Sequence, residues 1–539
     1  MRSTARMTGR NRLLLLASAL AIALPAQALG AAGSGAATPA GDSWVTSSPS
    51  YVASSGNVAG VTFAPLINSG ETAFGTMFEG IPDGIGVVPS NHGYVDLYIA
   101  HEQSPVPFQG FADYMNSTVS RVRVDIESKR IIAMDVPLTA DEGFIRFCSA
   151  FMAGPEHGFP HYTFLLNEES NDPLAVPAGA SYGSDPGAVA LYGAGTRQAG
   201  YAVYLDTANG KVGALASQGR HNHENNVIVP GGWSGIYGIS GDDTFTFPST
   251  PARPNLSQLY LSASNNWKAF QKDESTLWAF RVTGTGGAPI DPADALNGAN
   301  DYLDIAPGVD WTGEFIPVPE DIARGTTGDL PQDALEDWSN ANNVFQFVRV
   351  EDVAYDPDNP REVYFADTGN SRLIDPGTGR LYRAPSGTPG TTSSNGRIFK
   401  IVMNAADPTK VDSFSIVGQG DNPAAAGYVP FRAPDNIDVG HNSLMVQEDA
   451  SNAKIWMFSL SSGTWTHVAT ATQPSAETSG IVDLHTWFGA GWWALDVQSH
   501  VNIHQTPGVT YTGPGPNNGV VHTQRREDGQ LLLMYIPGS

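Results

Sequence analysis

The chain has 539 residues, and its hydrophobic share of 41% with 10% aromatic side chains is that of a globular protein. This composition excludes intrinsic disorder and provides enough apolar side chains to bury a large core. The formal net charge of −25 argues against binding to nucleic acid or to an anionic membrane surface, because both repel an acidic protein.

Residues 1–28 have the pattern of a secretory signal, with four arginines, the apolar run LLLLASALAIAL and the small-residue pattern Ala26-Gln27-Ala28. We expect this signal to be removed and to leave a flexible leader over 29–45, so that the protein is periplasmic or secreted. Without the four arginines, 25 basic side chains face 54 acidic ones, a formal charge of −29. No second apolar run of membrane-spanning length follows, and we expect no membrane insertion.

The remaining chain, 46–539, has two-residue periodicity, and its 59 glycines and 38 prolines are spread as turn residues. This pattern predicts one all-β domain, with long surface loops at 283–298 and 384–396. An apolar strand that ends in acidic or amide residues recurs six times: LYIAHE (97–102), TFLLNEE (163–169), IYGISGDD (236–243), VYFADT (363–368), LMVQED (444–449) and WWALDVQ (492–498). Six copies predict a six-bladed β-propeller with long inserted loops.

A second signature precedes most of these strands: PDGIGVV (82–88), HENNVIV (223–229), VEDVAYD (350–356), PDNIDV (434–439) and SGIVDL (479–484). In a propeller, polar residues at the ends of inner strands converge on the central channel. A close ring of carboxylates repels itself, so this arrangement requires cations between the acids. Oxygen ligands favour Ca2+, with iron or manganese as further candidates. For any single copy, the alternative is an ordinary turn built by Asp, Asn or Gly.

Five blocks of the sequence resemble, in order and spacing, those of the PhoX-type alkaline phosphatase family: GRHNHENN (219–226), RVEDVAYDP (349–357), NGRIFKI (395–401), APDNIDV (433–439) and LDVQSH (495–500). The resemblance extends from about residue 60 to about residue 500. It implies a six-bladed propeller whose channel holds a calcium-and-iron cluster with an oxo-bridged iron pair. It also implies hydrolysis of phosphate monoesters, and sometimes diesters, outside the cytoplasm.

The same resemblance implies roles for particular residues. Glu224 and Glu351 would bind metal, and Arg349 would face the phosphoryl group. Four further residues fall on matching acidic or amide positions and would complete the cation shell: Glu168, Asp435, Asn436 and Asp449.

The chain departs from the family at one position. Where the family usually has Thr-Cys-Glu-Glu, with a thiolate that binds iron, this chain has Leu166-Asn167-Glu168-Glu169. A neutral Asn amide is a poor ligand for Fe3+, so we expect Ca2+ as the main cofactor and depletion of iron. The single cysteine, Cys148, lies about twenty residues upstream. We interpret it as a small buried side chain and not as a replacement ligand.

Two basic groups are the candidates for catalysis. Arg349 and Glu351 alternate onto one strand face, where a guanidinium can bind a phosphoryl group through paired hydrogen bonds. The alternative for Arg349 is an ion pair with Glu351 or Asp352 that only neutralises an acid. His221 and His223 also share a face. We predict His223 to transfer protons or bind metal, with simple packing beside the channel as the alternative.

Three functions are compatible with this pattern. The first is an exported metal-dependent phosphohydrolase, acting as a monomer on a small-molecule phosphate ester. The second is a calcium-dependent propeller esterase or lactonase, which needs no phosphate-binding arginine. The third is a non-catalytic binding propeller that is stabilised by calcium.

Overall fold

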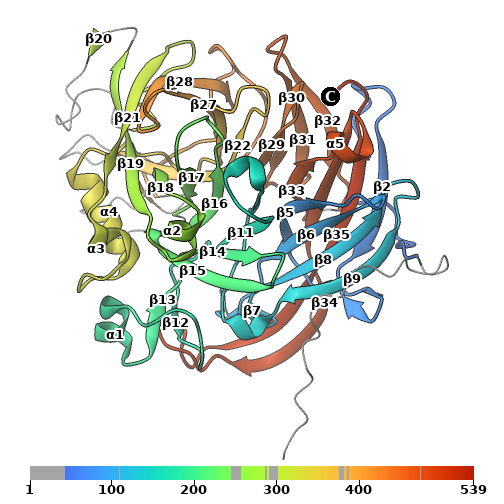
Figure 1. The fold of residues 1–539 in the computed structure, drawn as a ribbon, viewed down its shortest axis with the longest axis horizontal. Coiled ribbons are helices and arrows are strands. Elements are labelled where there is room, and N and C mark those ends of the chain that lie inside the picture. Colours follow the sequence, from blue (N-terminus) through green and yellow to red (C-terminus); the bar gives the residue numbers. More distant parts are fainter. Residues whose placement is uncertain are drawn as a thin grey trace, which may run out of the picture. The chain divides into compact units, whose positions relative to one another are not determined.

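The computed structural model describes residues 43–108, 110–244, 257–285, 288–289, 301–374, 381–384, 388–473 and 475–539. The predicted signal, most of the predicted leader and parts of the two predicted surface loops lie outside this set. Among the described residues, strands dominate and helices are short. The sheets are arranged around a common centre (Figure 1).

Each of the six blades is an antiparallel sheet of four strands. From the centre outward, blade 1 contains β5 (Pro82–Pro89), β6 (Tyr94–His101), β8 (Thr118–Asp125) and β9 (Ile131–Leu138). In the same order, blade 2 contains β10 (Phe151–Ala153), β11 (Thr163–Asn167), β14 (Tyr201–Asp206) and β15 (Lys211–Arg220). Blade 3 contains β16 (His223–Ile228), β17 (Ile236–Asp242), β18 (Leu259–Ser264) and β19 (Thr276–Thr285).

Blade 4 contains β22 (Val350–Tyr355), β23 (Glu362–Asp367), β27 (Arg397–Met403) and β28 (Lys410–Gln419). Blade 5 contains β29 (Pro434–Val439), β30 (Ser443–Glu448), β31 (Lys454–Ser459) and β32 (Trp465–Ala471), with β1 (Val52–Ser54) at its outer edge. Blade 6 contains β33 (Glu477–Asp483), β34 (Trp492–Thr510), β35 (Val521–Tyr535) and β2 (Thr62–Asn68). The prediction of a six-bladed all-β propeller is confirmed.

The structure also contains short strands and helices besides the blade strands. Strand β21 (Trp311–Pro317) pairs with β19 and β28 and so joins the outer edges of blades 3 and 4. The other short strands are β3 (Thr72–Ala73), β4 (Thr76–Met77), β7 (Phe111–Asp113), β12 (Pro173–Ala175), β13 (Thr196–Gln198), β20 (Ala288–Pro289), β24 (Ser371–Ile374), β25 (Leu381–Arg383) and β26 (Thr392–Ser393). The helices are α1 (Pro186–Tyr192), α2 (Trp267–Gln271), α3 (Glu320–Ala323), α4 (Pro331–Ala341), α5 (His485–Phe488) and two 3-10 turns at Ala140–Glu142 and Pro155–His157. None of the helices in the described ranges has the length and apolar character needed to cross a membrane.

The six innermost strands, β5, β10, β16, β22, β29 and β33, form a closed ring in which each contacts the next and β33 contacts β5. The ring is closed by chain segments from opposite ends of the sequence. Strand β2 pairs with β35 and supplies the outer strand of blade 6, while β1 extends blade 5. The N-terminal segment therefore holds together blades built from the last hundred or so residues.

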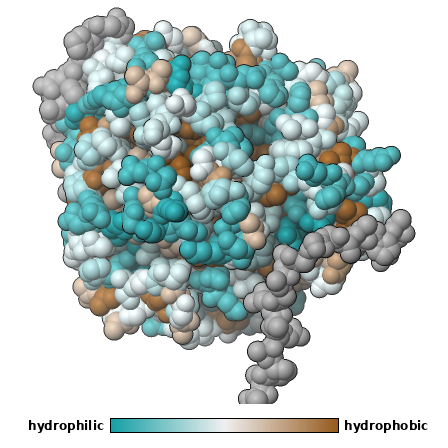
Figure 2. Space-filling view, viewed as in Figure 1, coloured by the Kyte–Doolittle hydropathy of each residue, from teal (hydrophilic) through white to brown (hydrophobic). Residues whose placement is uncertain are grey.

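The core consists of one apolar cluster at each junction between neighbouring blades. The sequence of β11 has consecutive apolar residues and does not alternate with polar ones. Phe164 and Leu166 pack toward blade 1, whereas Leu165 packs toward blade 3, so both faces of the strand are buried. Hydrophilic side chains dominate the face shown in Figure 2, where apolar side chains form small separate groups.

The hairpin formed by β34 and β35 extends beyond blade 6 along the edge of the ring (Figure 1). Strand β35 pairs in parallel with β7, and Tyr511 near the tip packs against Val106, Ile145 and Leu174. Blade 6 therefore reaches across blade 1 to blade 2 on the side where the polar strand ends gather.

The closure of the propeller by β2 can be tested by mutation. Leu66 is fully buried in the junction between blades 6 and 1. Leu66→Ala should lower the free energy of unfolding by about 2–5 kcal/mol, because it leaves a cavity in that junction. Thr62→Ala, on the exposed start of the same strand, is the matched control and should change little. Urea unfolding of the three proteins measures the difference, and equal stabilities would contradict closure through β2.

Candidate metal centre

Four innermost strands carry the same β-bulge near their first residue. In β16, His223 pairs with Asp242 and Asn226 with Ser240, so three steps along β16 match two along β17. Strands β5, β22 and β29 repeat this offset. A bulge re-aims a side chain that a regular ladder would place on a blade face. The second residues of these strands, which lie in the bulges, are Asp83, Glu224, Glu351 and Asp435.

The second strands of the blades contribute acids next to the bulged residues of the innermost strands. In blade 1, His101 pairs with Pro82, and the next residue is Glu102. In blades 2, 3 and 5 the residues that follow the equivalent ladder positions are Glu169, Asp243 and Asp449. The bulged and the following positions of several blades therefore meet at one end of the channel.

There they surround a cavity of about 260 Å3, which we call the charged chamber. Its lining residues are Asp83, Glu102, Phe108, Arg146, Cys148, Glu169, Arg349, Glu351, Asp435, Asp449, Glu477, Gln498 and His500. Seven of these side chains are carboxylic acids and only three are basic, so the chamber is strongly acidic.

The acids form four linked groups, and in each group the ligand atoms lie within 4.8 Å of one another. The groups are Asp83, Glu102 and Cys148; Cys148, Glu169 and Glu224; Glu169, Asp243 and Glu351; and Glu224, Glu351 and Asp435. Because consecutive groups share members, they form one continuous set with several adjacent positions for a cation.

Burial raises the pKa of Glu169, Glu224 and Asp435 well above that of an ordinary carboxyl, and repulsion by neighbouring carboxylates raises it further. Burial raises the pKa of the Cys148 thiol as well. Within the described residues, Glu224 Oε2 and Asp435 Oδ1 are buried without a hydrogen-bond partner. Unpaired buried carboxylate oxygens are costly, and bound cations both satisfy them and favour their ionised form.

A polar layer holds these groups in place. Asn436 Nδ2 donates to Asp83 Oδ1 at 3.1 Å and to Ser149 Oγ at 2.7 Å, and Ser149 Oγ donates to Glu224 Oε1 at 2.7 Å. Gln498 Nε2 donates to Asp83 Oδ2 at 3.0 Å and to Glu102 Oε1 at 2.6 Å. Neutral donors hold both oxygens of Asp83 and one oxygen each of Glu102 and Glu224, so each of these acids keeps one orientation.

Arg349 lies at the edge of the acid set. Its Nε donates to Asp243 Oδ1 at 2.7 Å and its Nη2 to Asp243 Oδ2 at 2.5 Å, with Glu351 Oε1 3.0 Å from the same Nη2. The ion pair with Glu351 that was the alternative for Arg349 is present, whereas Asp352 accepts from Val353 N and Ile437 N. Nη1 has no protein partner in the parts of the chain that the structure describes, and it belongs to a side chain that lines the chamber.

His500 supplies another positive charge. Its Nε2 lies 3.3 Å from Glu477 Oε2 and its Nδ1 lies 2.5 Å from Glu527 Oε2. These two carboxylates outweigh its partial burial and raise the pKa of His500 to about 11. His500 is therefore a fixed cation at neutral pH.

The structure brings together four of the residues predicted to bind metal, Glu224, Glu351, Asp435 and Asp449, and places Asn436 in the polar layer beneath them. Glu168 lies elsewhere. Both of its oxygens accept hydrogen bonds from Arg197, at 2.7 and 2.6 Å, and the side chain is fully buried. The ladder position of Glu168 faces the blade, and the next residue, Glu169, faces the channel.

His223 is also turned away from the chamber. Its Nδ1 lies 2.9 Å from Ser240 Oγ, and its Nε2 donates to the Gly219 carbonyl at 3.1 Å. Burial lowers the pKa of His223 to about 4, so the ring is neutral at pH 7. With both nitrogens engaged, His223 supports the structural alternative of packing beside the channel.

Cys148 is the largest change from the sequence interpretation. It is buried, as expected, but its Sγ lies 3.3 Å from Asp83 Oδ2 and 3.8 Å from Glu102 Oε1. It also belongs to two of the four linked groups. Asn167 instead pairs with its surroundings: with its amide oriented to match its neighbours, it donates to the Leu166 carbonyl at 2.8 Å and accepts from Asn226 N at 3.2 Å. The thiol of Cys148 is therefore in position to bind a metal ion. The expectation that iron is depleted, which was based on Asn167, loses its reason.

Sequence comparisons give no match, either to a protein-family model or to a curated protein. Comparison with solved structures does find similar proteins. PhoX of Pseudomonas fluorescens, solved in complex with vanadate, a transition state analogue, matches with a TM-score of 0.55 over 89% of this chain and 95% of that chain, at 13% identity. This chain has a PhoX-like fold. A protein of unknown function from Dyadobacter fermentans covers 89% of this chain and all of that chain with a TM-score of 0.40 and 10% identity.

Glu224 and Glu168 provide a matched pair of mutations. Glu224→Gln should weaken metal binding by about tenfold or more, because Glu224 belongs to two linked groups. Glu168→Gln should leave the metal content unchanged but lower the free energy of unfolding by about 3–5 kcal/mol, since it leaves Arg197 buried without its partner. Elemental analysis and calorimetry of both variants measure the two effects. Equal metal loss in both would contradict the assignment of Glu168 to the blade.

The raised pKa values also predict how stability depends on pH when metal is removed. Between the unfolded and folded pKa values, the folded state binds more protons, so the free energy of unfolding falls as pH rises. For Glu477 this window extends from 4.5 to about 8. The Tm of chelated protein should therefore fall between pH 5 and pH 8, and calcium should largely abolish the fall. A metal-free Tm that rises over this range would contradict the electrostatic account.

Proposed function

We propose that the protein is an exported metal-dependent phosphohydrolase that acts on small-molecule phosphate esters in the charged chamber. The observation that carries this proposal is the continuous set of buried acids with Arg349 at its edge. A phosphate ester is an anion, and the acids alone repel it, so bound cations are required before it can enter. Resemblance of the fold to PhoX, which was solved with vanadate, supports the same class of substrate.

The donors fit two kinds of metal ion. Two of the four linked groups, the one that contains Asp243 and the one that contains Asp435, offer carboxylate oxygens alone, the ligands that Ca2+ prefers. Cys148 adds a sulfur ligand to the other two groups, which suits iron better than calcium. Bound cations in these positions would polarise the phosphoryl oxygens and stabilise an attacking oxygen nucleophile. We therefore propose Ca2+ with iron as a second ion.

The protein's own cations orient the substrate. Arg349 is fixed by Asp243 and Glu351 through Nε and Nη2, so Nη1 remains to donate to a phosphoryl oxygen. Arg146 is held by Ser170 at 3.0 Å, by Asp172 and by the Val106 carbonyl at 3.2 Å, and its guanidinium stacks 4.0 Å from the Phe108 ring. These contacts make Arg146 a fixed charge at the chamber wall, whereas Arg349 is the proposed phosphate ligand.

The test compares substrates and variants. The wild-type protein should hydrolyse p-nitrophenyl phosphate in the presence of calcium and lose this activity after chelation. Arg349→Ala should lower turnover by about 30- to 1000-fold through the loss of a charge-assisted contact. Arg349→Lys should recover part of it, because it keeps the charge without the fork geometry.

Arg121→Ala is the matched control, since Arg121 makes a half-exposed ion pair with Asp135 on the outer strands of blade 1. It should leave turnover unchanged. Phenyl acetate and a lactone test the esterase alternative. Hydrolysis of these substrates without phosphatase activity would favour the esterase, and binding of calcium with no hydrolysis of any substrate would favour the non-catalytic propeller.

A further inference from the structure

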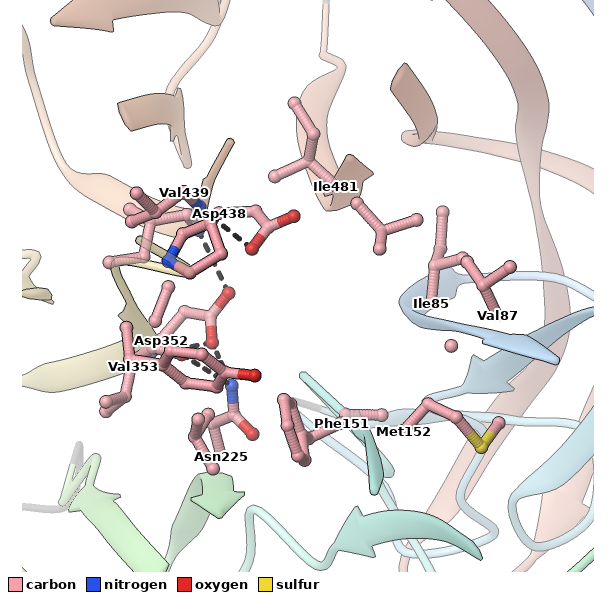
Figure 3. A pocket seen from close by; sticks show the side chains of 18 of the residues that line it. Ile85, Val87, Phe151, Met152, Asn225, Asp352, Val353, Asp438, Val439 and Ile481 are labelled. Atoms are coloured by element: carbon pink, nitrogen blue, oxygen red, sulfur yellow. Dashed lines mark hydrogen bonds between the residues drawn. The ribbon is translucent and has the colours of Figure 1, made fainter. Parts of the chain in front are cut away.

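A second cavity lies further along the same channel and is separate from the charged chamber. It has a volume of about 220 Å3, and we call it the apolar chamber. Its walls come from later residues of the innermost strands, including Ile85, Val87, Val353, Val439 and Ile481, which lie around the hollow in Figure 3. Strands advance about 3.3 Å per residue, so these side chains lie roughly 7–13 Å beyond the bulged acids.

The polar layer separates the two chambers. Asn436 lies at its centre, bonded to Asp83 and Ser149, and accepts from Ser479 Oγ at 3.3 Å. Gln498 Nε2 also lies 3.2 Å from Ser479 Oγ. These bonds link blades 1, 2, 5 and 6 across the channel. Among the residues that the structure describes, the two chambers share no lining residue, so a ligand of the apolar chamber does not occupy the charged chamber.

The charged groups of the apolar chamber all have one sign. Its lining contains three carboxylic acids, Glu156, Asp352 and Asp438, and, in the described part of the chain, no lysine or arginine. Its one histidine, His157, is neutral: Nδ1 accepts from Gly154 N at 2.9 Å, so the ring proton is on Nε2, which lies 2.8 Å from Tyr355 Oη. The chamber therefore has no positive charge with which to bind an anion.

Two of these carboxylates are held by the backbone at the chamber wall. Asp352 accepts from Val353 N at 2.7 Å, from Ile437 N at 2.9 Å and from the Asn225 amide. Asp438 accepts from Val439 N at 2.8 Å and from Asp483 N at 2.7 Å. All these donors are N–H groups, which stabilise a carboxylate over a carboxylic acid. Figure 3 shows both side chains beside the hollow.

Aromatic side chains complete the lining. Phe151, Tyr162, Tyr355 and Trp487 contribute to it, and the rings of Phe151 and Tyr355 lie 6.3 Å apart in an edge-on arrangement. Aromatic faces next to carboxylates are the usual surroundings of organic ammonium groups. The apolar walls match an uncharged hydrocarbon part of the same ligand.

From this combination we propose that the apolar chamber is a binding site for a small organic ammonium ion with an apolar body. The site is independent of the proposed phosphatase reaction. The volume of about 220 Å3 limits the ligand to roughly ten non-hydrogen atoms, since even a free water molecule takes about 30 Å3 in the liquid and bonded atoms pack more closely.

The probe for this site is benzyltrimethylammonium, whose charge does not depend on pH. Benzyl alcohol is the neutral comparison and phenylacetate the anionic one. Titration calorimetry uses the calcium-loaded protein at pH 9, far above the ordinary pKa of a carboxyl group. The cation should bind saturably and about tenfold more tightly than benzyl alcohol, and phenylacetate should not bind. Equal affinities for the three, or no saturable binding of the cation, would overturn the proposal.

Two variants locate the binding. Met152→Trp adds an indole to a half-buried wall residue and should abolish binding of the cation. Its matched control is Leu191→Trp on the exposed surface of α1, which should bind as the wild type does. If Met152→Trp fails to fold, Glu156→Gln at the exposed mouth of the chamber replaces it as the test. This variant should weaken binding of the cation about threefold and leave the affinity for benzyl alcohol unchanged. Wild-type affinity for the cation in either folded variant would contradict the location.

Discussion

Repulsion among buried carboxylates is the constraint that organises this molecule. Seven acids and one thiol lie in linked groups with ligand atoms 4.8 Å apart or less, and burial raises the pKa of Glu224 and Asp435 among them. At neutral pH the set is stable only if protons or metal cations neutralise it, because fixed positive charges are few. Arg349 contacts only two members of the set, Asp243 and Glu351, whereas His500 is paired with Glu477 and Glu527, which lie outside it.

The β-bulges connect this site to the stability of the propeller. In blade 4 the bulge directs Glu351 to the charged chamber and the next residue, Asp352, to the neighbouring blades, where it bonds Ile437 N and Asn225. Asp438 of blade 5 makes a further contact between blades, because it accepts a hydrogen bond from Asp483 N of blade 6. One local irregularity thus supplies both a metal ligand and a contact between blades. Loss of the ligands and loss of the blade contacts should therefore affect metal content and stability in different proportions.

Much of the fold could be predicted from the sequence, because the repeated strands carry the same polar ends in each blade. The six acid-ended strands are the second strands of the blades, and the five PDGIGVV-like copies are innermost strands. Closure by β2 could not be predicted, since the pairing joins residues more than 450 positions apart and leaves no local pattern. The extension of β34 and β35 toward blade 2 was hidden for the same reason.

The site was predictable only in part. Glu224, Glu351 and Asp435 share one position in their repeats, and Asp83 occupies the equivalent position in PDGIGVV, so an alignment of the repeats would have found it. Glu168 and Glu169 are adjacent acids, and only the pairing register decides which one faces the channel. Cys148 precedes a strand of only three residues, a signal too short to place its thiol.

Anomalous X-ray diffraction from crystals of the metal-loaded protein tests the central claim most directly. The account predicts anomalous peaks in the charged chamber, each within about 2.0–2.6 Å of carboxylate oxygens of Glu224, Glu351 or Asp435, with a signal at the iron edge confined to the neighbourhood of Cys148. A fully metal-loaded, phosphatase-active protein whose anomalous peaks all lie outside this chamber would contradict the account.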